Sequence, residues 1–593
     1  MSKQIRQDDE PRGLRRRDVL KGLAGAGALG ATSLPAIAAV PSDASTTWNQ
    51  QADVVIVGSG IAATSAAIAA TQRGATVIMI EKMPFKGGTT AKSAGVFWIP
   101  NNPLLRAAGV VDDRLDALRY MVRLAYPDSF LPNHPTLGAP AAAFTLLETF
   151  VDNASPVLEK LMADTGLRII PWQFAPDAIW PDYYGHIPEN KVSKGRSLVT
   201  DVRPYPERHF WAGGGGSGES LLWMLQQGFD KRPIQMLLEH QVLAVTQNAA
   251  GQVTGVVADG GETQPIRVRA NKAVMFATGG FTHNVPMADG FLRGKIWGGC
   301  AAPGSTGDFV GIATGLGATL GNMNNAWWAQ VPVEVAVKTR SVPSNVWSCP
   351  GDSMLEVNRY GVRFGNEKVA YNERAQLHFT WDPVKLEYPN QLGFMIWDSR
   401  TSKAYAGYDP IPLPTAKPAH IIEAATLPEL RKAIEARLLA IAPQTGGITL
   451  AKDFDANLQK AIQRFNGFAK SGKDADFQRG GTPNENAWQY AVVKPAANPY
   501  ANKTMHPIAS TGPFYAVILG AGTLDTKGGP IVNASGQVLH ASGQPIPGLY
   551  GAGNCVASPA HQAYWGGGGT IGPAMTFGYL AGTAAAAEAI RPA

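Results

Sequence analysis

The chain has 593 residues, which is too long for a single hydrophobic core and predicts two or three domains. Hydrophobic residues make up 45% and charged residues 17%, and this balance excludes a disordered chain. The net charge of +6 is small and scattered along the sequence, so no nucleic-acid partner is expected.

The N-terminus resembles an export signal. Arg16-Arg17-Asp-Val-Leu-Lys is a twin-arginine pattern, and the Gly/Ala-rich run from Gly22 to Ala31 is followed by Ala36-Ile-Ala38, a small-x-small cleavage signal. The alternative, a basic tail before a membrane anchor, is disfavoured because the apolar run is too short to span a bilayer. We therefore expect residues 1–38 to direct export by the twin-arginine route, and the mature protein to be periplasmic.

The cysteines argue against a metal or disulfide framework. Cys300, Cys349 and Cys555 are far apart, odd in number and outside any CxxC spacing. No metal site is predicted.

A dinucleotide fingerprint follows the leader. The apolar strand Ala52–Gly58 runs into an Ala-rich helix that ends near Gln72, and a second strand, Ala75–Ile80, comes next. This is a βαβ unit with a Gly-x-Gly-x-x-Ala turn, a pattern that is specific when it lies between two strands. Its key residues are Gly58, which permits the turn, Gly60, which lets the backbone approach a pyrophosphate, Ala63, which allows close helix packing, and Glu81, which can accept hydrogen bonds from ribose.

Three further features favour FAD over NAD. A second small-residue loop, Lys82–Gly95, directly follows the ribose strand, and strands before Gly279 and before Gly553 also run into glycines. Such passages, spread over 500 residues, indicate one discontinuous flavin domain. The residues expected to contact FAD, besides the fingerprint, are Lys82, Gly87, Gly88, Thr89, Thr90, Ser93, Gly95, Gly279, Asp308, Gly553, Asn554 and Ile571.

For the segments between these glycine loops, the sequence predicts only secondary structure. Residues 104–205 are expected to be mainly helical, with apolar periodicity over Phe144–Met162, and Glu219–Gly228 and Phe309–Leu316 are expected to form further helices. The alternating segment Gln235–Ala270 is predicted to be a small β-meander.

The predicted fold class is α/β. A Rossmann-like FAD-binding domain is assembled from residues 50–325 and 500–593, and residues 326–499, rich in Trp and Pro, form an inserted α+β substrate-capping domain. The C-terminal part holds Tyr564-Trp-Gly-Gly-Gly-Gly569 just before a helix start at Thr570. A phenol beside exposed backbone amides is a plausible pair for polarising a carbonyl group.

From about Ala52 to Ala585 the chain resembles the flavoproteins that include fumarate reductases and 3-ketosteroid Δ1-dehydrogenases, and it resembles the latter more. The shared motifs are Gly-Gly-Thr-Thr at 87–90, Pro-Asp-Tyr-Tyr at 181–184, Asn358-Arg-x-Gly-x-Arg-Phe-x-Asn-Glu367, Thr526-Lys-Gly-Gly529, and Tyr564-x-Gly-x-Gly568 with Gly572.

The resemblance implies an α,β-dehydrogenation of an apolar cyclic ketone, with a 3-ketosteroid at C1–C2 as the expected substrate. It assigns the carbonyl-binding pair to Tyr564 and the amide of Gly568, the proton-abstracting base to Tyr371, and the support of that base to Tyr183. Hydrogen bonds to the carbonyl oxygen acidify the α-carbon by stabilising the enolate, and flavin N5 takes the β-hydrogen. Trp565 and Trp180 are expected to shape an apolar pocket, whereas His561 is expected to be a solvated loop residue.

Several alternatives stay open. A fumarate-type reductase needs cations for a dicarboxylate; Ala557–Met575 contains none, although Arg359 and Arg363 are candidates elsewhere. A Δ4-type or other cyclic-ketone dehydrogenase would use similar parts, and a non-enzymatic electron carrier is a further possibility. A quinone or similar compound is expected to accept the electrons. The apolar run Tyr408–Thr415 is a candidate contact for a long substrate side chain, and peripheral membrane association is possible.

Overall fold

The structure is a computed structural model and describes residues 47–175, 177–261, 264–490 and 496–591. The predicted export signal, residues 1–38, lies outside the described residues. The described residues belong to one compact unit. Within the described ranges, no helix has the length and apolar character needed to cross a membrane.

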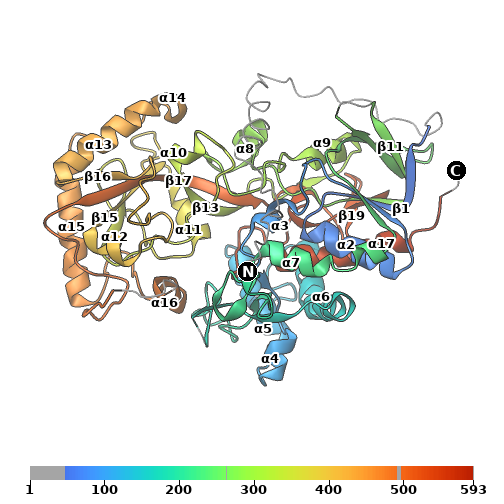
Figure 1. Cartoon of the computed structure of the whole chain (residues 1–593), viewed down its shortest axis with the longest axis horizontal. Coiled ribbons are helices and arrows are strands. Elements are labelled where there is room, and N and C mark those ends of the chain that lie inside the picture. Colours follow the sequence, from blue (N-terminus) through green and yellow to red (C-terminus); the bar gives the residue numbers. More distant parts are fainter. Residues whose placement is uncertain (1–46, 176, 262–263, 491–495, 592–593) are drawn as a thin grey trace, which may run out of the picture. The chain divides into compact units, whose positions relative to one another are not determined.

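A mainly parallel sheet forms the cofactor half of the molecule (Figure 1). The predicted fingerprint strand, β1 (Gln50–Val57), lies between β2 (Val77–Ile80) and β11 (Ile266–Phe276) and is parallel to both. The sheet continues from β11 to β20 (Pro545–Gly551) and β19 (Gln537–Leu539), and from β2 to β8 (Ile234–Leu237). Because parallel strands end at the same edge, the glycine loops that follow β1, β11 and β20 converge there, although they are far apart in sequence.

Two helices from opposite ends of the chain cover this sheet side by side (Figure 1). They are α2 (Ile61–Gln72) and α17 (Ile571–Ala587). A Cβ atom on Gly578 or Gly582 of α17 would lie 2.4 Å from a backbone oxygen of α2, so only glycine permits this approach. The N-terminus of α17 is thereby held next to the fingerprint loop.

The predicted meander over Gln235–Ala270 is partly wrong. β9 (Gln241–Gln247), β10 (Val253–Asp259) and β11 pair antiparallel in succession, as expected. The first strand, β8, instead pairs parallel with β2. It follows helix α7 (Gly218–Leu225), and a strand reached through a helical crossover enters a parallel sheet, which alternation alone does not reveal.

The segment 104–205 is helical only in its first part. It contains α4 (Pro103–Ala107), α5 (Arg114–Ala125) and α6 (Ala141–Thr165). After Thr165 the expectation fails, because the chain forms short strands of two to four residues, too brief to show a period. These are β4 (Ile169–Pro171), β5 (Gln173–Ala175), β6 (Ala178–Ile179) and β7 (Ser197–Thr200), and β7 also pairs with β3 (Phe97–Trp98).

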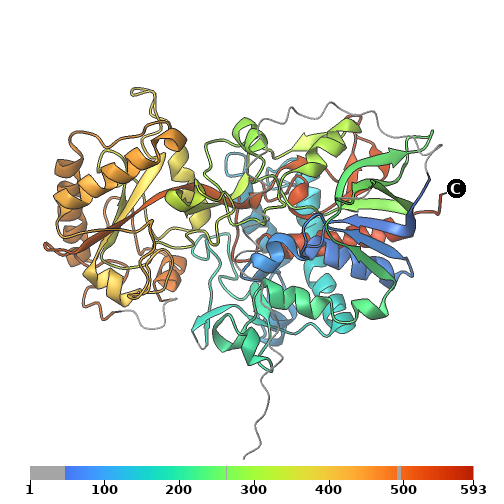
Figure 2. The same ribbon diagram turned by 45° about the horizontal axis from the view of Figure 1, so that its top comes forward.

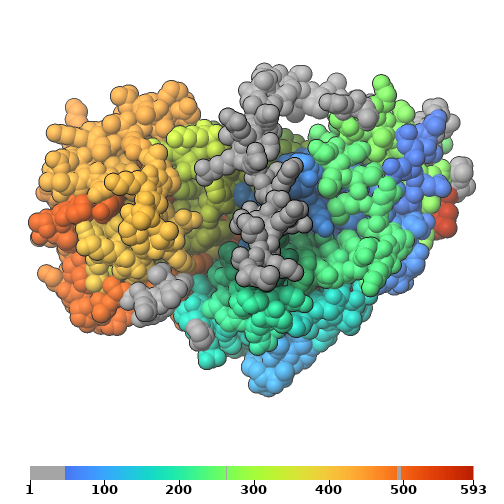
Figure 3. Space-filling model, viewed as in Figure 1, coloured from blue at the N-terminus to red at the C-terminus, as the bar shows by residue number. Residues whose placement is uncertain are grey.

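A second, antiparallel sheet forms the core of another lobe, which is yellow to orange in Figures 2 and 3. Its strands are β13 (Ala326–Pro332), β14 (Met354–Val357), β15 (Leu392–Asp398), β16 (Ile422–Ala424) and β17 (Phe514–Thr526). Its helices are α10 (Val333–Ala336), α11 (Tyr371–Gln376), α12 (Ser399–Ala404), α13 (Leu427–Ala440), α14 (Ala442–Thr445), α15 (Phe454–Ser471) and α16 (Pro483–Tyr490).

The long strand β17 joins the two halves. It pairs with β13, β15 and β16 of this lobe, although its sequence lies beyond residue 499, the predicted end of the capping domain. Figures 1 and 2 show β17 extending from the cofactor half into the lobe. The exact domain boundaries stay a prediction.

Candidate active site

A single cavity of about 1180 Å³ runs from the fingerprint loop to a group of aromatic side chains. Of the residues predicted to contact FAD, fourteen line it: Gly58, Gly60, Glu81, Lys82, Gly88, Thr89, Thr90, Ser93, Gly95, Gly279, Asp308, Gly553, Asn554 and Ile571. Ala63 and Gly87 do not line it. Ala63 is fully buried in α2, and Gly87 packs against Ala91 and Leu222. All four predicted catalytic residues line the same cavity.

The fingerprint glycines suit a dinucleotide. Gly58 has φ +108°, and a Cβ atom there would lie 2.4 Å from the carbonyl oxygen of Ala277, so no other residue type is accommodated. At Gly60, where φ is ordinary, a Cβ would meet the Thr90 hydroxyl at 3.4 Å and the Gly87 carbonyl oxygen at 3.8 Å, which are ordinary contacts. The space that a side chain at Gly60 would fill is therefore part of the cavity, open for the close approach of a pyrophosphate.

Glu81 ends β2 at the position predicted for a ribose partner. One of its carboxylate oxygens accepts from the Ser59 hydroxyl at 2.6 Å, and the other accepts from the Met83 amide at 2.9 Å. Each oxygen of a carboxylate has a second lone pair, so Glu81 remains able to accept from a ligand hydroxyl. Nearby, Lys82 and Asp308 form an ion pair at 2.8 Å across two of the predicted loops.

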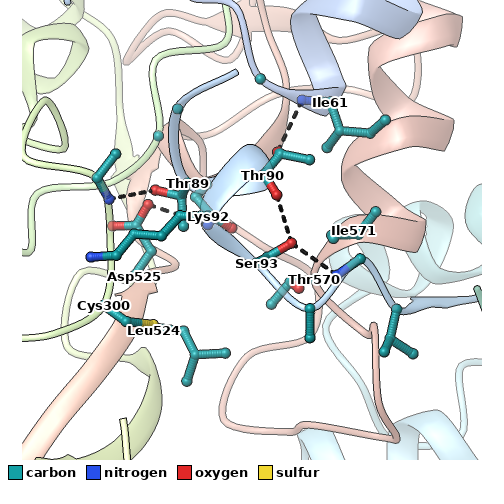
Figure 4. A pocket seen from close by; sticks show the side chains of 18 of the residues that line it. Ile61, Thr89, Thr90, Lys92, Ser93, Cys300, Leu524, Asp525, Thr570 and Ile571 are labelled. Atoms are coloured by element: carbon teal, nitrogen blue, oxygen red, sulfur yellow. Dashed lines mark hydrogen bonds between the residues drawn. The ribbon is translucent and has the colours of Figure 1, made fainter. Parts of the chain in front are cut away.

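The Gly-Gly-Thr-Thr motif forms the short helix α3 (Gly88–Lys92), shown in Figure 4. Its threonines tie neighbouring segments together: Thr90 accepts from the amide of Ile61 at 3.1 Å, and Thr89 accepts from the amide of Ala302 at 2.9 Å. Ser93 donates to the carbonyl oxygen of Thr90 at 2.7 Å. The motif thus fixes the fingerprint loop and the loop at 302–308 around the cavity.

Sequence reasoning missed Lys92 and Cys300, which both line the cavity and are labelled in Figure 4. The Lys92 ammonium donates to the carbonyl oxygen of Val342 at 2.7 Å, and burial lowers its pKa. Burial raises the pKa of the Cys300 thiol to about 12, so this cysteine is a neutral wall residue. A lysine within a loop of small residues was the signal that could have identified Lys92.

Three tyrosines from distant parts of the chain meet at the aromatic end of the cavity. Tyr183, Tyr371 and Tyr564 are all buried, and each pair of rings has its centroids 5.4 or 5.5 Å apart in an edge-on arrangement. The hydroxyl of Tyr183 donates to the hydroxyl of Tyr371 at 2.7 Å. These are the three tyrosines that the resemblance singled out, and the fold brings them together.

Burial keeps the cluster protonated. Loss of solvent raises the pKa of Tyr183 and of Tyr371 well above the usual value of 10, and the neighbouring phenols add to this for Tyr371. Burial also raises the pKa of Tyr564, but contacts with Tyr371, Thr570 and the Gly568 amide oppose the rise. The cluster is therefore a set of neutral hydrogen-bond donors near pH 7.

Gly568 lies beside Tyr564 in a conformation that only glycine tolerates. Its φ is +88°, and a Cβ there would lie 2.4 Å from the backbone of Phe97. Its backbone amide interacts with the Tyr564 hydroxyl. A phenol and an amide are thus adjacent at the N-terminus of α17, where a ligand oxygen would find two donors.

Tyr183 is positioned by a buried ion-pair network. Asp182, just before it, accepts from the Trp98 indole at 2.8 Å and from Arg196 at 2.9 Å. Arg196 is itself fully buried and also pairs with Asp112. Burial raises the pKa of Asp182 to about 6, although Arg196 opposes the rise. The aspartate of the Pro-Asp-Tyr-Tyr motif therefore anchors the segment that carries Tyr183 and does not contact the substrate.

Tyr371 begins α11 and is positioned by the Asn-Arg-x-Gly-x-Arg-Phe-x-Asn-Glu motif. Arg363 donates to Glu367 at 2.6 Å and to Asp474 at 2.8 Å, and Arg479 donates to Glu367 at 3.1 Å. Burial acts to raise the pKa of Glu367, but Arg363 outweighs it and lowers the pKa to about 2. These buried charges fix the loop that presents Tyr371 to the cavity.

Aromatic side chains form the remaining wall at this end. Trp172 stacks on Trp180 with centroids 4.1 Å apart, and Trp488 meets Trp180 edge-on at 4.6 Å. The expectation for Trp180 is met, but that for Trp565 is wrong. Trp565 donates to the Met121 carbonyl oxygen and packs on Trp98, outside the cavity. This aromatic wall comprises Trp172, Phe174, Trp180, Phe210, Trp211, Trp347 and Trp488.

His561 also lies outside the cavity. Its ring is within 3.0 Å of the Ala125 carbonyl oxygen and stacks on Tyr126. It is partly buried rather than solvated, because the loop folds back on α5.

Comparisons with known proteins agree with this site. A family model described as FAD binding domain matches residues 53–571. The chain is 32% identical over 568 residues to the 4-oxocyclohexanecarboxylate 2-dehydrogenase of Sinomonas cyclohexanicum, covering 91% of this chain and 93% of that protein. It is 32% identical over 587 residues to a 3-oxosteroid 1-dehydrogenase of Mycolicibacterium smegmatis, covering 91% and 98%.

A solved structure is similar over nearly the whole chain. It is the 3-ketosteroid delta1-dehydrogenase of Sterolibacterium denitrificans in complex with 1,4-androstadiene-3,17-dione, with a TM-score of 0.73 and 25% identity. The alignment covers 91% of this chain and 100% of that one.

Proposed function

This chain belongs to the FAD binding domain family and is an FAD-dependent oxidoreductase, and we propose that it desaturates a neutral cyclic ketone, namely a 3-ketosteroid at its C1–C2 bond. The matched family model and the similar flavoenzymes confirm the predicted cofactor, FAD. The coarser activity, dehydrogenation of a steroid or cyclic ketone, agrees with the relatives. The choice of ketone and bond is the proposal.

One observation carries it: Tyr183, Tyr371, Tyr564 and Gly568 converge on one point of the cavity. A ketone oxygen between the Tyr564 hydroxyl and the Gly568 amide would meet two donors aimed at the position where enolate charge develops. In its phenolate form, Tyr371, whose oxygen accepts a hydrogen bond from Tyr183, would take a proton from the α-carbon. FAD, when bound, supplies the acceptor for the second hydrogen.

Charge at the aromatic end supports a neutral substrate. Lys82 and Lys92 line the cavity, and both are engaged, with Asp308 and the Val342 carbonyl oxygen respectively. Asp409 also lines the cavity, and its carboxyl lies beside Ser344, which accepts a hydrogen bond from the indole of Trp347 in the aromatic wall. Among the described residues no arginine lines the cavity, and a substrate carboxylate beside the aromatic wall would meet the carboxyl group of Asp409.

The two arginines that were candidates for binding a dicarboxylate in a fumarate-type reductase are both engaged in ion pairs. Arg359 pairs with Glu387, and Arg363 pairs with Glu367 and Asp474. Neither arginine lines the cavity. Both instead stabilise the capping lobe, so they do not support a dicarboxylate site.

A substrate panel tests the function. The purified holoenzyme is mixed anaerobically with 3-ketosteroids, cyclohexanone, 4-oxocyclohexanecarboxylate and, with reduced dye as donor, fumarate. We expect a 3-ketosteroid to bleach the flavin and to give the 1,2-unsaturated product. Bleaching by cyclohexanones alone would favour a small-ketone desaturase, a double bond at C4–C5 would favour a Δ4-type enzyme, and turnover of fumarate alone would refute the proposal.

The role of the base is tested separately. Tyr371→Phe keeps the ring but removes the hydroxyl, so FAD should stay bound while reduction by the ketone falls by roughly 10²-fold or more. A rate of flavin reduction equal to that of the wild type would show that Tyr371 is not the base.

Two further proposals concern the setting of the enzyme. The Arg16-Arg17 pattern and the cleavage signal after it support export by the twin-arginine route to the periplasm. A quinone or similar compound would then reoxidise the flavin, and a peripheral membrane location would bring the enzyme near both quinone and steroid. Fractionation of cells producing the wild type or Arg16→Lys/Arg17→Lys tests the export step, because only the wild type should reach the periplasm.

A further inference from the structure

A buried lysine lies directly behind the carbonyl-binding tyrosine. Lys527, from the Thr526-Lys-Gly-Gly529 motif, has no exposed surface. Its ammonium donates to the carbonyl oxygen of Ala563 at 2.8 Å and lies 4.1 Å from the centre of the Trp327 ring. Ala563 immediately precedes Tyr564, and Trp327 packs on the Tyr564 ring with centroids 5.1 Å apart. The ammonium therefore fixes Tyr564 through both its backbone and its ring.

The same region ties Tyr564 to the base. Asn372, next to Tyr371, donates to the carbonyl oxygen of Gln562 at 3.4 Å and to Glu373 at 2.7 Å, and it accepts from the Trp328 amide at 3.2 Å. Burial lowers the pKa of Lys527 well below its ordinary value and raises the pKa of Glu373, while the nearby Glu373 carboxyl opposes the fall at Lys527 by favouring its ammonium form. Lys527 and Asn372 thus both hold the peptide segment just before Tyr564, and Asn372 joins it to the start of α11, where Tyr371 lies.

Buried charge at this place affects chemistry as well as geometry. Burying an ionic group costs free energy of folding, so a well-packed apolar side chain at this position would stabilise the fold equally well. A positive charge behind the carbonyl-binding pair, in a region of low dielectric, favours the negative charge that develops on the ketone oxygen. A structural role alone does not explain why a cation occupies this position.

Resting on the proposed function, we propose that Lys527 is a positioning residue for enolate formation: its ammonium fixes Tyr564 and increases polarisation of the ketone carbonyl. The reaction itself is unchanged: the α-carbon C–H bond breaks, the phenolate form of Tyr371 takes the proton to form its O–H bond, and the electron pair of the C–H bond moves onto the ketone oxygen as the enolate. Lys527 exchanges no proton with the substrate in this step.

The test uses holoenzyme variants and a 3-ketosteroid labelled with ¹³C at its ring carbonyl. Lys527→Met should lower the rate of flavin reduction about 10- to 100-fold while changing the dissociation constant of the steroid less than about threefold. The infrared C=O stretch of the bound ketone should shift less from its value in water than with the wild type. Lys527→Arg keeps the charge and should restore part of both effects.

Lys272→Met is the matched control. The Lys272 ammonium also donates to a backbone carbonyl oxygen at 2.8 Å, but its partner is Ala586 at the C-terminal end of α17, not the peptide segment that precedes Tyr564. Its removal should leave the reduction rate and the C=O stretch unchanged. FAD content and thermal unfolding of each variant report loss of structure.

A second variant changes the charge without touching Lys527. The charged and titratable groups that act on Lys527 are Glu373, Arg293 and His561. Since Glu373 stabilises the ammonium, Glu373→Gln should make the C=O shift disappear at a lower pH than in the wild type. This readout keeps the inference testable if Lys527→Met fails to fold.

Outcomes separate the inference from the proposed function. Failure of every ketone to reduce the wild-type flavin overturns both. Normal wild-type reduction together with an unchanged rate or an unchanged C=O stretch in Lys527→Met overturns the inference alone, as does a Glu373→Gln enzyme whose C=O shift follows the wild-type pH dependence.

Discussion

The hydroxyl of Tyr183 donates to the hydroxyl of Tyr371 at 2.7 Å, although 188 residues separate the two. Because this hydrogen bond orients the lone pairs of the Tyr371 oxygen, Tyr183 should determine the direction in which Tyr371 removes the proton. We expect Tyr183→Phe to lower the rate of flavin reduction by roughly 10²-fold with a small change in steroid affinity, as measured by stopped-flow absorbance. Tyr579→Phe, which loses a hydroxyl bonded to Gln72, is the control and should behave as the wild type.

The rate of flavin reduction should rise with pH. Burial and the neighbouring phenols raise the pKa of Tyr371 well above 10, so near pH 7 only a small fraction is phenolate. The phenolate fraction increases with pH, so the rate of flavin reduction should rise by at most about tenfold per pH unit between pH 7 and 9. Single-turnover reduction measured across this range checks the sign; a rate that falls or stays flat would argue against a tyrosine base.

The two fingerprint glycines should respond differently to alanine. In Gly60→Ala the added methyl makes ordinary contacts with Thr90 at 3.4 Å and Gly87 at 3.8 Å, so the fold should survive while FAD affinity falls by about tenfold or more. Gly58→Ala would clash with Ala277 at 2.4 Å with φ at +108°, so it should destabilise the protein as well. Flavin fluorescence and thermal unfolding separate these cases. Gly311→Ala, on the exposed side of α9 (Asp308–Gly315), has open space and should change neither quantity.

Asp409 should disfavour anionic ketones. Its carboxyl lies beside Ser344 on the cavity wall, and burial raises its pKa. In Asp409→Asn we expect kcat/KM for 4-oxocyclohexanecarboxylate to rise about fivefold relative to that for cyclohexanone, because the like charge is gone. Asp382→Asn, which alters a carboxylate outside the cavity, should leave the ratio unchanged. An unchanged ratio in Asp409→Asn would show that Asp409 does not face the substrate.

A buried histidine should make the protein sensitive to acid. Burial lowers the pKa of His378 to about 4, whereas the unfolded chain has the ordinary value of about 6.5. Between these values the unfolded state binds a proton that the folded state does not, so stability is lost as pH falls from 6.5 to 4, by up to ~3 kcal/mol. Denaturant unfolding of the wild type and His378→Gln should therefore show a shallower acid slope in the variant; identical slopes would contradict the assignment.

The sequence by itself determined the cofactor half. Gly58, Gly60 and Glu81 follow strands whose apolar runs are long enough to be recognised, and local chemistry dictates each role, so the α/β fold and FAD followed without tertiary information. The resemblance likewise identified Tyr183, Tyr371, Tyr564 and Gly568, and the structure places them together.

Only the tertiary structure decided how these residues work together. The exclusion of Trp565 from the cavity, the pairing of β17 with the capping lobe, and the position of Lys527 behind Tyr564 depend on contacts between residues up to hundreds of positions apart. Periodicity and spacing report which face of an element is buried, but not against what it packs. The protonation of the tyrosines has the same origin, since it depends on the solvent and charges that surround each phenol once the chain has folded.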